Sequence, residues 1–144
     1  MLFVLKIVPV TTLKQALVVR QIRNACREYM TRDQSKVSFF KQLRWWFFKP
    51  KTRRVVMVTN HGYEIGYGVI NGNEITGCIL KDWRGEGAGR FLFEYLTREV
   101  PKPGSLEVLS SNIRARRLYE SLGWKYVNWS KWSIGLKVRE MEYA

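Results

Sequence analysis

The sequence predicts an α+β domain: a mixed, mainly antiparallel sheet of about seven strands, flanked by about four helices. Three observations lead to this fold class. Residues 55–80 contain three strand-like segments separated by turn signals, and a glycine-rich turn at residues 84–90 then opens an amphipathic segment. Apolar residues also recur at helical spacing on both sides of this region. The 144 residues suffice for one core and contain no linker, so residues 1–144 are expected to form a single domain.

The first part of the chain is expected to hold one strand and two helices. The strand covers residues 2–8, and the helices run from residue 11 or 12 to about 29 and from 38 to 48. Hydroxyl side chains can cap both helices by accepting from unpaired N–H groups, and prolines end the strand and the second helix. These residues are Pro9, Thr11 or Thr12, Ser38 and Pro50.

The middle of the chain predicts an antiparallel meander. Its strands are expected at residues 55–60, 63–70 and 74–80. The pairs His61-Gly62 and Asn71-Gly72 are the turn signals between them, and Asn-Gly is the strongest short hairpin signal.

After the glycine turn, a helix, a strand, a helix and a hairpin are expected in that order. The corresponding residues are 88–100, 106–109, 112–122, and 124–129 with 132–139. On the first of these helices, the spacing directs four residues toward the core: Phe91, Leu92, Tyr95 and Leu96.

The composition indicates a folded protein, because 46% of the residues are hydrophobic. Two cysteines, Cys26 and Cys78, are too few for a disulfide framework, so a cytoplasmic location is expected. The apolar residues 1–10 lack a basic leader and are too short to span a bilayer, so no membrane partner is expected. A single histidine predicts that no metal takes part.

Charge is distributed unevenly along this basic chain, whose formal net charge is +13. Residues 1–60 contain 13 Lys and Arg against 2 Asp and Glu, a net of +11, whereas residues 61–144 contain 12 against 10, a net of +2. A basic excess attracts anionic partners such as nucleic acid, an acidic peptide or a phosphorylated sugar. Solvated basic residues that only keep the protein soluble are an equal alternative.

The glycine turn has the properties of a phosphate-binding turn. It consists of Arg84, Gly85, Glu86, Gly87, Ala88, Gly89 and Arg90. Its backbone N–H groups have little side-chain cover, and the start of a helix adds unpaired N–H groups and the positive end of a dipole. A dinucleotide fingerprint needs glycine where Arg90 stands, and a P-loop needs Lys-Ser/Thr after Gly89, so neither pattern fits. Both also expect a parallel sheet, which the meander argues against.

The turn resembles the coenzyme A loop of the GNAT N-acetyltransferase superfamily, Arg/Gln-x-x-Gly-x-Gly/Ala, at Arg84, Gly87 and Gly89. A second segment agrees with it: residues 112–124 resemble the family's Asn…Ala-x-x-x-Tyr-x-x-x-Gly-Phe segment, with Trp124 in place of Phe. The resemblance is specific between residues 63 and 126. It implies the acyl-CoA N-acyltransferase fold and acetyl-CoA as co-substrate.

The resemblance implies three sets of contacts with coenzyme A. Backbone N–H groups of residues 85–90 would bind the pyrophosphate, and Arg84 and Arg90 would add positive charge. The backbone of Ile79 and Leu80 would bind the pantetheine arm, and an N–H there would polarise the thioester carbonyl. Asn112 would contact the arm through its side chain; a simple helix N-cap is an equal alternative.

For the leaving group, Tyr119 matches the family tyrosine that gives a proton to the departing thiolate. The alternative role is a core residue, and the two roles are compatible because a buried ring can present its hydroxyl at a site.

Two strand carboxylates, Glu74 and Glu64, are candidates for the general base, with Glu74 preferred; a plain exposed strand position is the alternative for each. His61, in a turn, is a weaker candidate for the base. Cys78 is a weak candidate for the nucleophile of a covalent mechanism, and a core position on its strand is the preferred alternative.

Residues 39–54 interleave aromatic and basic side chains. Such a pattern suits stacking on bases with phosphate neutralisation, an aromatic core stripe with basic side chains at its edge, or the lip of an acceptor pocket. The combination of core and pocket lip is preferred.

Together these features predict an acetyl-CoA-dependent N-acetyltransferase that transfers acetyl directly to a primary amine. The basic half would repel a free polycation, so the acceptor is expected to be neutral or anionic, and a small molecule rather than a polymer. One alternative is a nucleic-acid-modifying acyltransferase that docks DNA or RNA on residues 1–60. The other is a non-catalytic acyl-CoA-binding module.

Overall fold

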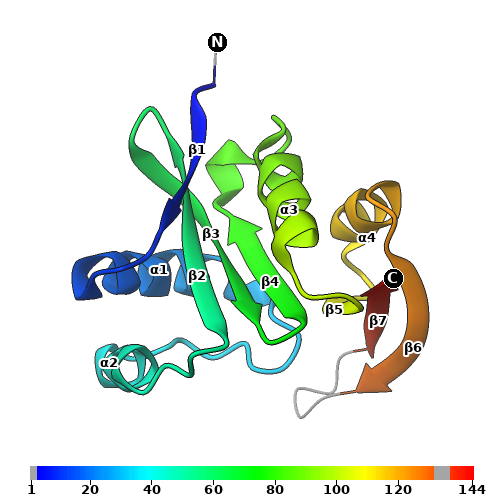
Figure 1. The fold of residues 1–144 in the computed structure, drawn as a ribbon, viewed down its shortest axis with the longest axis horizontal. Helices are drawn as coiled ribbons and strands as arrows, with labels where there is room; N and C mark the ends of the chain where they lie inside the picture. The colour runs from blue at the N-terminus through cyan, green and yellow to red at the C-terminus, as the bar shows by residue number, and fades with distance from the viewer. Residues whose placement is uncertain (1–2, 132–136) are drawn as a thin grey trace.

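A computed structural model describes residues 3–131 and 137–144, and it confirms a mainly antiparallel seven-stranded sheet with four α-helices (Figure 1). The strand order is β1-β2-β3-β4-β5-β7-β6. The elements are β1 Leu5–Pro9, α1 Leu13–Ala25, α2 Phe39–Phe47, β2 Arg53–Asn60, β3 Tyr63–Asn71, β4 Glu74–Ile79, α3 Ala88–Glu99, β5 Gly104–Leu109, α4 Ile113–Ser121, β6 Lys125–Lys131 and β7 Lys137–Tyr143. Within the described residues no helix is long and apolar enough to cross a membrane.

The N-terminal helices begin at the predicted caps. The Thr12 hydroxyl accepts from the Gln15 N–H, and the Gln15 side chain accepts from the Thr12 N–H, which forms a capping box. The Ser38 hydroxyl caps α2 by accepting from Lys41 N at 3.1 Å. Helix α1 is shorter than predicted, because the backbone leaves α-helical geometry at the buried Cys26 and a short 3-10 helix, Arg27–Tyr29, follows.

The β3–β4 hairpin has its turn one residue later than the Asn-Gly signal places it. Asn71 still pairs with Glu74, so Gly72 and Asn73 make the turn. Gly72 has a φ of 64°, which fits a turn with glycine in its first central position.

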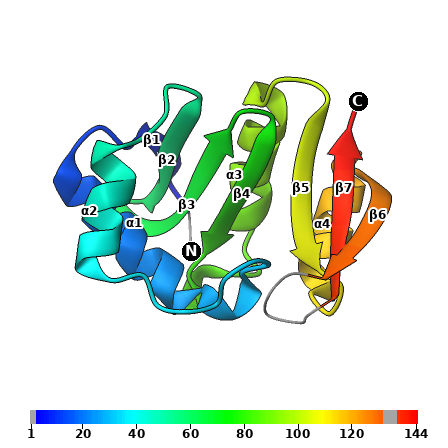
Figure 2. The ribbon, with the colours of Figure 1, turned by 90° about the horizontal axis from the view of Figure 1, so that it is seen from below.

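Helices cover both faces of the sheet: α1 and α2 lie on one side, and α3 and α4 on the other (Figure 2). Successive strand residues point to opposite faces, so Val55 and Met57 join the core under α1, whereas Val56 and Val58 join the core under α3. This explains why β2 is apolar at every position from 55 to 58 rather than at alternate ones.

Two predicted packing patterns need correction. On α3, Leu92, Phe93 and Leu96 are buried, whereas Phe91 and Tyr95 are only partly buried at the edge of the core. In the aromatic-basic segment, Trp45 and Trp46 pack against the core under α1 as predicted. A core position is wrong for its phenylalanines, because Phe39, Phe40, Phe47 and Phe48 are exposed.

The C-terminal hairpin is present as β6 and β7, and β7 also pairs with β5. Residues 132–136, where the second strand was expected to begin, lie outside the described residues. Strand β7 continues to Tyr143, four residues beyond the predicted end. Trp124, just before β6, is buried, and its indole N–H donates to the Thr97 hydroxyl at 3.0 Å.

Candidate active site

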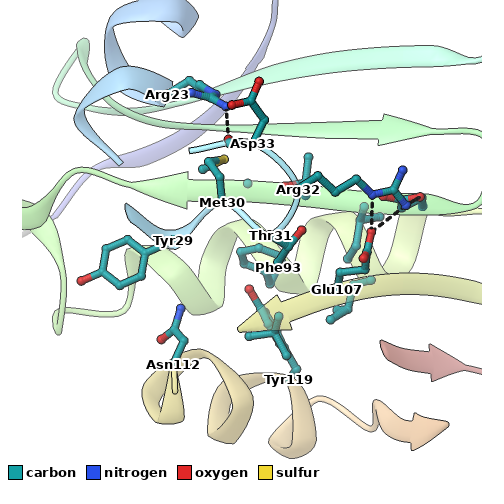
Figure 3. A pocket seen from close by; sticks show the side chains of 16 residues that line it. Arg23, Tyr29, Met30, Thr31, Arg32, Asp33, Phe93, Glu107, Asn112 and Tyr119 are labelled. Atoms are coloured by element: carbon teal, nitrogen blue, oxygen red, sulfur yellow. Dashed lines mark hydrogen bonds and ion pairs between the residues drawn. The ribbon is translucent and has the colours of Figure 1, made fainter. Parts of the chain in front are cut away.

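The centre of the sheet opens between β4 and β5. These neighbours run parallel, and in the described residues their register consists of the single pair Glu74 and Ser105. Beyond that pair the strands diverge around a cavity of about 260 Å³. Its lining comes from β4, β5, α3, α4 and the segment 29–33 that follows α1 (Figure 3). The residues that line it include Tyr29, Met30, Arg32, Glu74, Phe93, Glu107, Asn112 and Tyr119.

The glycine turn leads from β4 into α3. Gly85 and Gly87 have φ angles of 84° and 91°, in the region that favours glycine, and Gly87 is the N-cap of α3. No side chain caps this helix, so the N–H groups of its first turn are available to an anion. The geometry therefore suits an anion, and the pyrophosphate of coenzyme A as that anion stays a prediction.

A third arginine stands beside the turn. The Nη2 atom of Arg114 lies 2.6 Å from the position that a Cβ would take on Gly85. Arg114 belongs to the first turn of α4 and is exposed. Sequence reasoning missed it because the contact joins residues that are far apart in the chain.

The two predicted arginines use their side chains within the protein. Arg84 donates from Nε to the Ile79 carbonyl at 2.7 Å and from Nη1 to the Tyr29 hydroxyl at 3.2 Å. Arg90 donates to the Ser121 hydroxyl at 2.7 Å. These contacts hold the turn against β4 and α4, and a direct role of either guanidinium in ligand binding stays a prediction.

The backbone groups of Ile79 and Leu80 differ in where they point. Leu80 N–H donates to the Ile65 carbonyl at 2.8 Å, so it is engaged with β3. Because N–H groups of successive strand residues point to opposite edges, the N–H of Ile79 is directed away from β3, toward the opening beside β5. Ile79 is therefore the better placed of the two to meet a thioester carbonyl.

Both roles considered for Asn112 are compatible with its position. Its Oδ1 accepts from Ala115 N at 3.3 Å, so it is the N-cap of α4. The same residue lines the cavity, where Figure 3 shows it near Tyr29.

Tyr119 rises from α4 to the cavity and is both a core and a cavity residue (Figure 3). Its ring packs on Phe93 with centroids 4.8 Å apart. Burial raises the pKa of Tyr119 well above its usual value, so the phenol stays protonated at neutral pH.

Two carboxylates share one arginine at the cavity wall. The Nη2 atom of Arg32 lies 2.7 Å from Oε1 of Glu107 on β5 and 3.8 Å from Oε2 of Glu74 on β4. Burial is the main cause that raises the pKa of Glu74, with smaller contributions from Glu107 and Glu140, whereas Arg32 lowers it. Neither Arg32 nor Glu107 was predicted, since only the folded chain brings the segment after α1 against β5.

The weaker candidates lie elsewhere. Glu64 is exposed, and His61 has a φ of 50° in the β2–β3 turn; neither lines the cavity. The neighbouring Cys78 thiol is the largest cause that lowers the pKa of Cys26 to about 7, whereas burial raises it. Arg84 also contributes, with Nη2 at 3.5 Å from the Cys26 sulfur. Among the described residues no group of three potential ligands could hold a metal ion.

Solved structures of acetyltransferases share this fold. A Salmonella typhimurium structure solved with its cofactor acetyl-CoA has a TM-score of 0.75 at 18% identity, over 96% of this chain and 92% of that chain. Spermidine N-acetyltransferase from Vibrio cholerae, in complex with CoA and spermine, has a TM-score of 0.76 at 18% identity, over 96% and 94%. Ribosomal-protein-alanine N-acetyltransferase from Brucella melitensis has a TM-score of 0.77 at 16% identity, over 97% and 98%.

No curated protein matches the chain significantly. The family model for the acetyltransferase (GNAT) domain, in contrast, matches residues 35–144, which is most of the chain. This range includes the glycine turn, β4, β5 and Tyr119. The chain therefore belongs to the GNAT family of acetyltransferases, which take their acetyl group from acetyl-CoA.

Proposed function

We propose that this acetyltransferase moves the acetyl group of acetyl-CoA directly to a primary amine, on an acceptor that is neutral or anionic overall. The observation that carries the proposal is the cavity between β4 and β5, because a proton donor, Tyr119, and two carboxylates, Glu74 and Glu107, line the same space. Direct transfer needs an acid near the leaving sulfur and a base near the attacking amine, on opposite sides of the thioester carbon.

The donor would be held mainly by backbone groups. The N–H groups of residues 85–90 would bind the pyrophosphate, and the Arg114 guanidinium beside Gly85 would supply charge there. Asn112 would contact the pantetheine arm. The N–H of Ile79 would polarise the thioester carbonyl at the opening of the sheet.

The acceptor amine would take the place of the Arg32 guanidinium beside the two carboxylates. The Arg32 guanidinium already occupies the space next to Glu107 and Glu74, so this wall accommodates a positive group. An ammonium that enters would contact the same carboxylates. Glu74 would then take its proton, and the burial that raises the pKa of Glu74 makes it a stronger base.

Acetyl transfer then follows. The neutral amine attacks the thioester carbon, the new C–N bond forms, and the C–S bond breaks. Tyr119 gives its proton to the departing sulfur and regains one from solvent. Glu74 releases to solvent the proton that it took from the ammonium, and the nitrogen loses its second proton to solvent as the amide forms. Burial keeps Tyr119 protonated at neutral pH, as a general acid requires, and the raised pKa of Glu74 favours proton uptake by that carboxylate.

The overall charge proposed for the acceptor follows from the net charge of the protein, not from the cavity. With a formal net charge of +13, the protein attracts anionic molecules and repels polycations over several ångströms of solution. A single ammonium on a neutral or anionic acceptor meets the carboxylates without that long-range repulsion.

The test is a panel of primary amines of different overall charge, incubated with acetyl-CoA, with free thiol release and acetylated product both measured. Turnover should be found for at least one neutral or anionic amine. Glu74→Gln should reduce it strongly, and Glu64→Gln, which changes an exposed carboxylate on the neighbouring strand, should not. Tight coenzyme A binding without turnover on any amine would instead indicate a non-catalytic acyl-CoA-binding module.

A further inference from the structure

The outer face of α2 exposes large aromatic side chains. Phe40, Phe47 and Phe48 are 79%, 68% and 80% exposed. Phe40 and Phe47 lie seven positions apart with Arg44 between them, so Phe40, Arg44 and Phe47 share one side of the helix. Phe48 follows as the C-cap residue. The opposite side is fixed to the protein by the buried Gln42, which donates to the Ala16 carbonyl at 2.7 Å. The rings therefore face solvent, and we call Phe40, Arg44, Phe47 and Phe48 the α2 face.

Monomeric proteins rarely keep large adjacent apolar side chains in water without a partner. The α2 face is also separate from the active site, because none of its four residues lines the cavity. Acetyl transfer in the cavity therefore does not explain why these rings are exposed.

The surroundings of the α2 face are strongly basic. Residues 34–63 contain seven Lys and Arg and no Asp or Glu. The basic residues are Lys36, Lys41, Arg44, Lys49, Lys51, Arg53 and Arg54. Two of them meet carboxylates from other segments, in exposed pairs of Lys41 with Asp33 at 3.6 Å and Arg54 with Glu99 at 3.7 Å. The positive balance that remains favours an anionic partner and opposes a second copy of the same face.

The exposed groups suit hydrocarbon better than nucleic acid bases. The tryptophans, which are the best platforms for stacking, are partly buried and covered: Lys49 lies 4.3 Å from the centre of the Trp46 ring, and Arg53 lies 4.9 Å from that of Trp45. The amides that could read base edges are also engaged, since Gln42 bonds to Ala16 and Gln34 donates to the Glu28 carbonyl at 2.9 Å. What remains exposed is phenyl rings without polar atoms, beside cations.

We propose that the α2 face docks this protein on the surface of an anionic lipid bilayer. Phe40, Phe47 and Phe48 would enter the boundary between headgroups and acyl chains, while Arg44 and Lys51 would remain at the headgroup phosphates. A helix with phenylalanines on its outer face and Lys and Arg around them lies in the plane of such a surface and does not cross it. This proposal departs from the sequence-based expectation of no membrane partner, which was drawn from residues 1–10.

Vesicle sedimentation tests the proposal on the intact chain. The wild type should bind vesicles of phosphatidylcholine containing about a third phosphatidylserine, bind pure phosphatidylcholine at least about tenfold more weakly, and lose affinity as salt rises. Phe40→Ser/Phe47→Ser should lower the partition coefficient on the anionic vesicles at least about tenfold. Arg44→Gln/Lys51→Gln should lower it and weaken its dependence on salt.

Tyr63→Ser is the matched control, because it removes a 70% exposed aromatic at the β2–β3 hairpin and should leave binding unchanged. All variants change exposed positions, so their thermal unfolding midpoints should match the wild type. The proposal is wrong if the wild type does not bind the anionic vesicles, or if the phenylalanine variant binds as well as the wild type. It is also wrong if the face binds a single-stranded oligonucleotide in preference to vesicles, or if the chain is a dimer that Phe40→Ser/Phe47→Ser converts to a monomer.

Discussion

Replacing Tyr119 with phenylalanine removes one oxygen atom from the active site and little else. The ring contact with Phe93, with centroids 4.8 Å apart, is kept. Within the described residues the Tyr119 hydroxyl has no hydrogen-bond partner, so its loss leaves no buried group unsatisfied. The free energy of unfolding should therefore change by less than about 1 kcal/mol.

The effect on catalysis should be much larger. A positioned general acid contributes roughly a hundredfold to ten-thousandfold in rate, so kcat should fall by that factor, equivalent to about 2.7 to 5.5 kcal/mol of activation free energy. Affinity for coenzyme A should stay within about threefold, because the groups proposed to bind it are backbone N–H groups of the glycine turn. Since burial raises the pKa of Tyr119, the ratio of wild-type to variant rates should be constant across neutral pH.

The assay is thiol release from acetyl-CoA with the best amine of the panel, at saturating concentrations of both substrates. Tyr95→Phe is the matched control, because its hydroxyl accepts from Arg54 at 3.2 Å and does not line the cavity. The control should retain full activity. If Tyr119→Phe also keeps kcat within about threefold of the wild type, Tyr119 does not protonate the leaving group.

Three further predictions concern the glycine turn, the base and the sheet. Gly87→Ala puts a side chain at a φ of 91°, a conformation that strains any residue with a Cβ. Calorimetry should show that coenzyme A binds about tenfold or more weakly, while the protein remains folded. Unchanged affinity would count against the turn as the pyrophosphate site. Burial raises the pKa of Glu74 above its value in the unfolded chain. The free energy of unfolding of the wild type, relative to Glu74→Gln, should therefore fall as the pH rises from the ordinary glutamate pKa to the pKa in the folded protein. Urea unfolding at a series of pH values checks this, and the opposite trend contradicts it. Gly66→Ala places a Cβ 2.6 Å from the Cys78 carbonyl oxygen, so the unfolding free energy should drop by about 1 to 3 kcal/mol, and an unchanged melting temperature would contradict this packing.

The parts of the fold that could be predicted depend on local signals. Thr12 and Ser38 cap helices because a hydroxyl meets N–H groups three residues away, and the sequence displays that spacing. The glycine turn is also a local signal: Gly85 and Gly87 adopt positive φ, which the absence of a Cβ permits. Strand β2 has no alternation of apolar and polar residues at positions 55–58, since helices on both faces of the sheet bury successive residues.

The missed site residues depend on long-range contacts. Arg32 reaches Glu107 across 75 positions of sequence, and no local pattern in either segment indicates that ion pair. Arg114 meets Gly85 only because α4 returns beside the start of α3. The exposure of the phenylalanines of α2 could not be predicted, because apolar residues at helical spacing do not show which side of a short helix is packed.

A crystal structure with coenzyme A tests most directly whether the glycine turn and the β4–β5 cavity form one acetyl-transfer site. The pyrophosphate oxygens should lie at hydrogen-bond distance, about 3 Å, from N–H groups of residues 85–90, with the Arg114 guanidinium beside them. The sulfur should lie next to the Tyr119 hydroxyl, at the side of the cavity that faces Glu74. A pyrophosphate bound away from the turn, or a sulfur remote from Tyr119, would contradict this site.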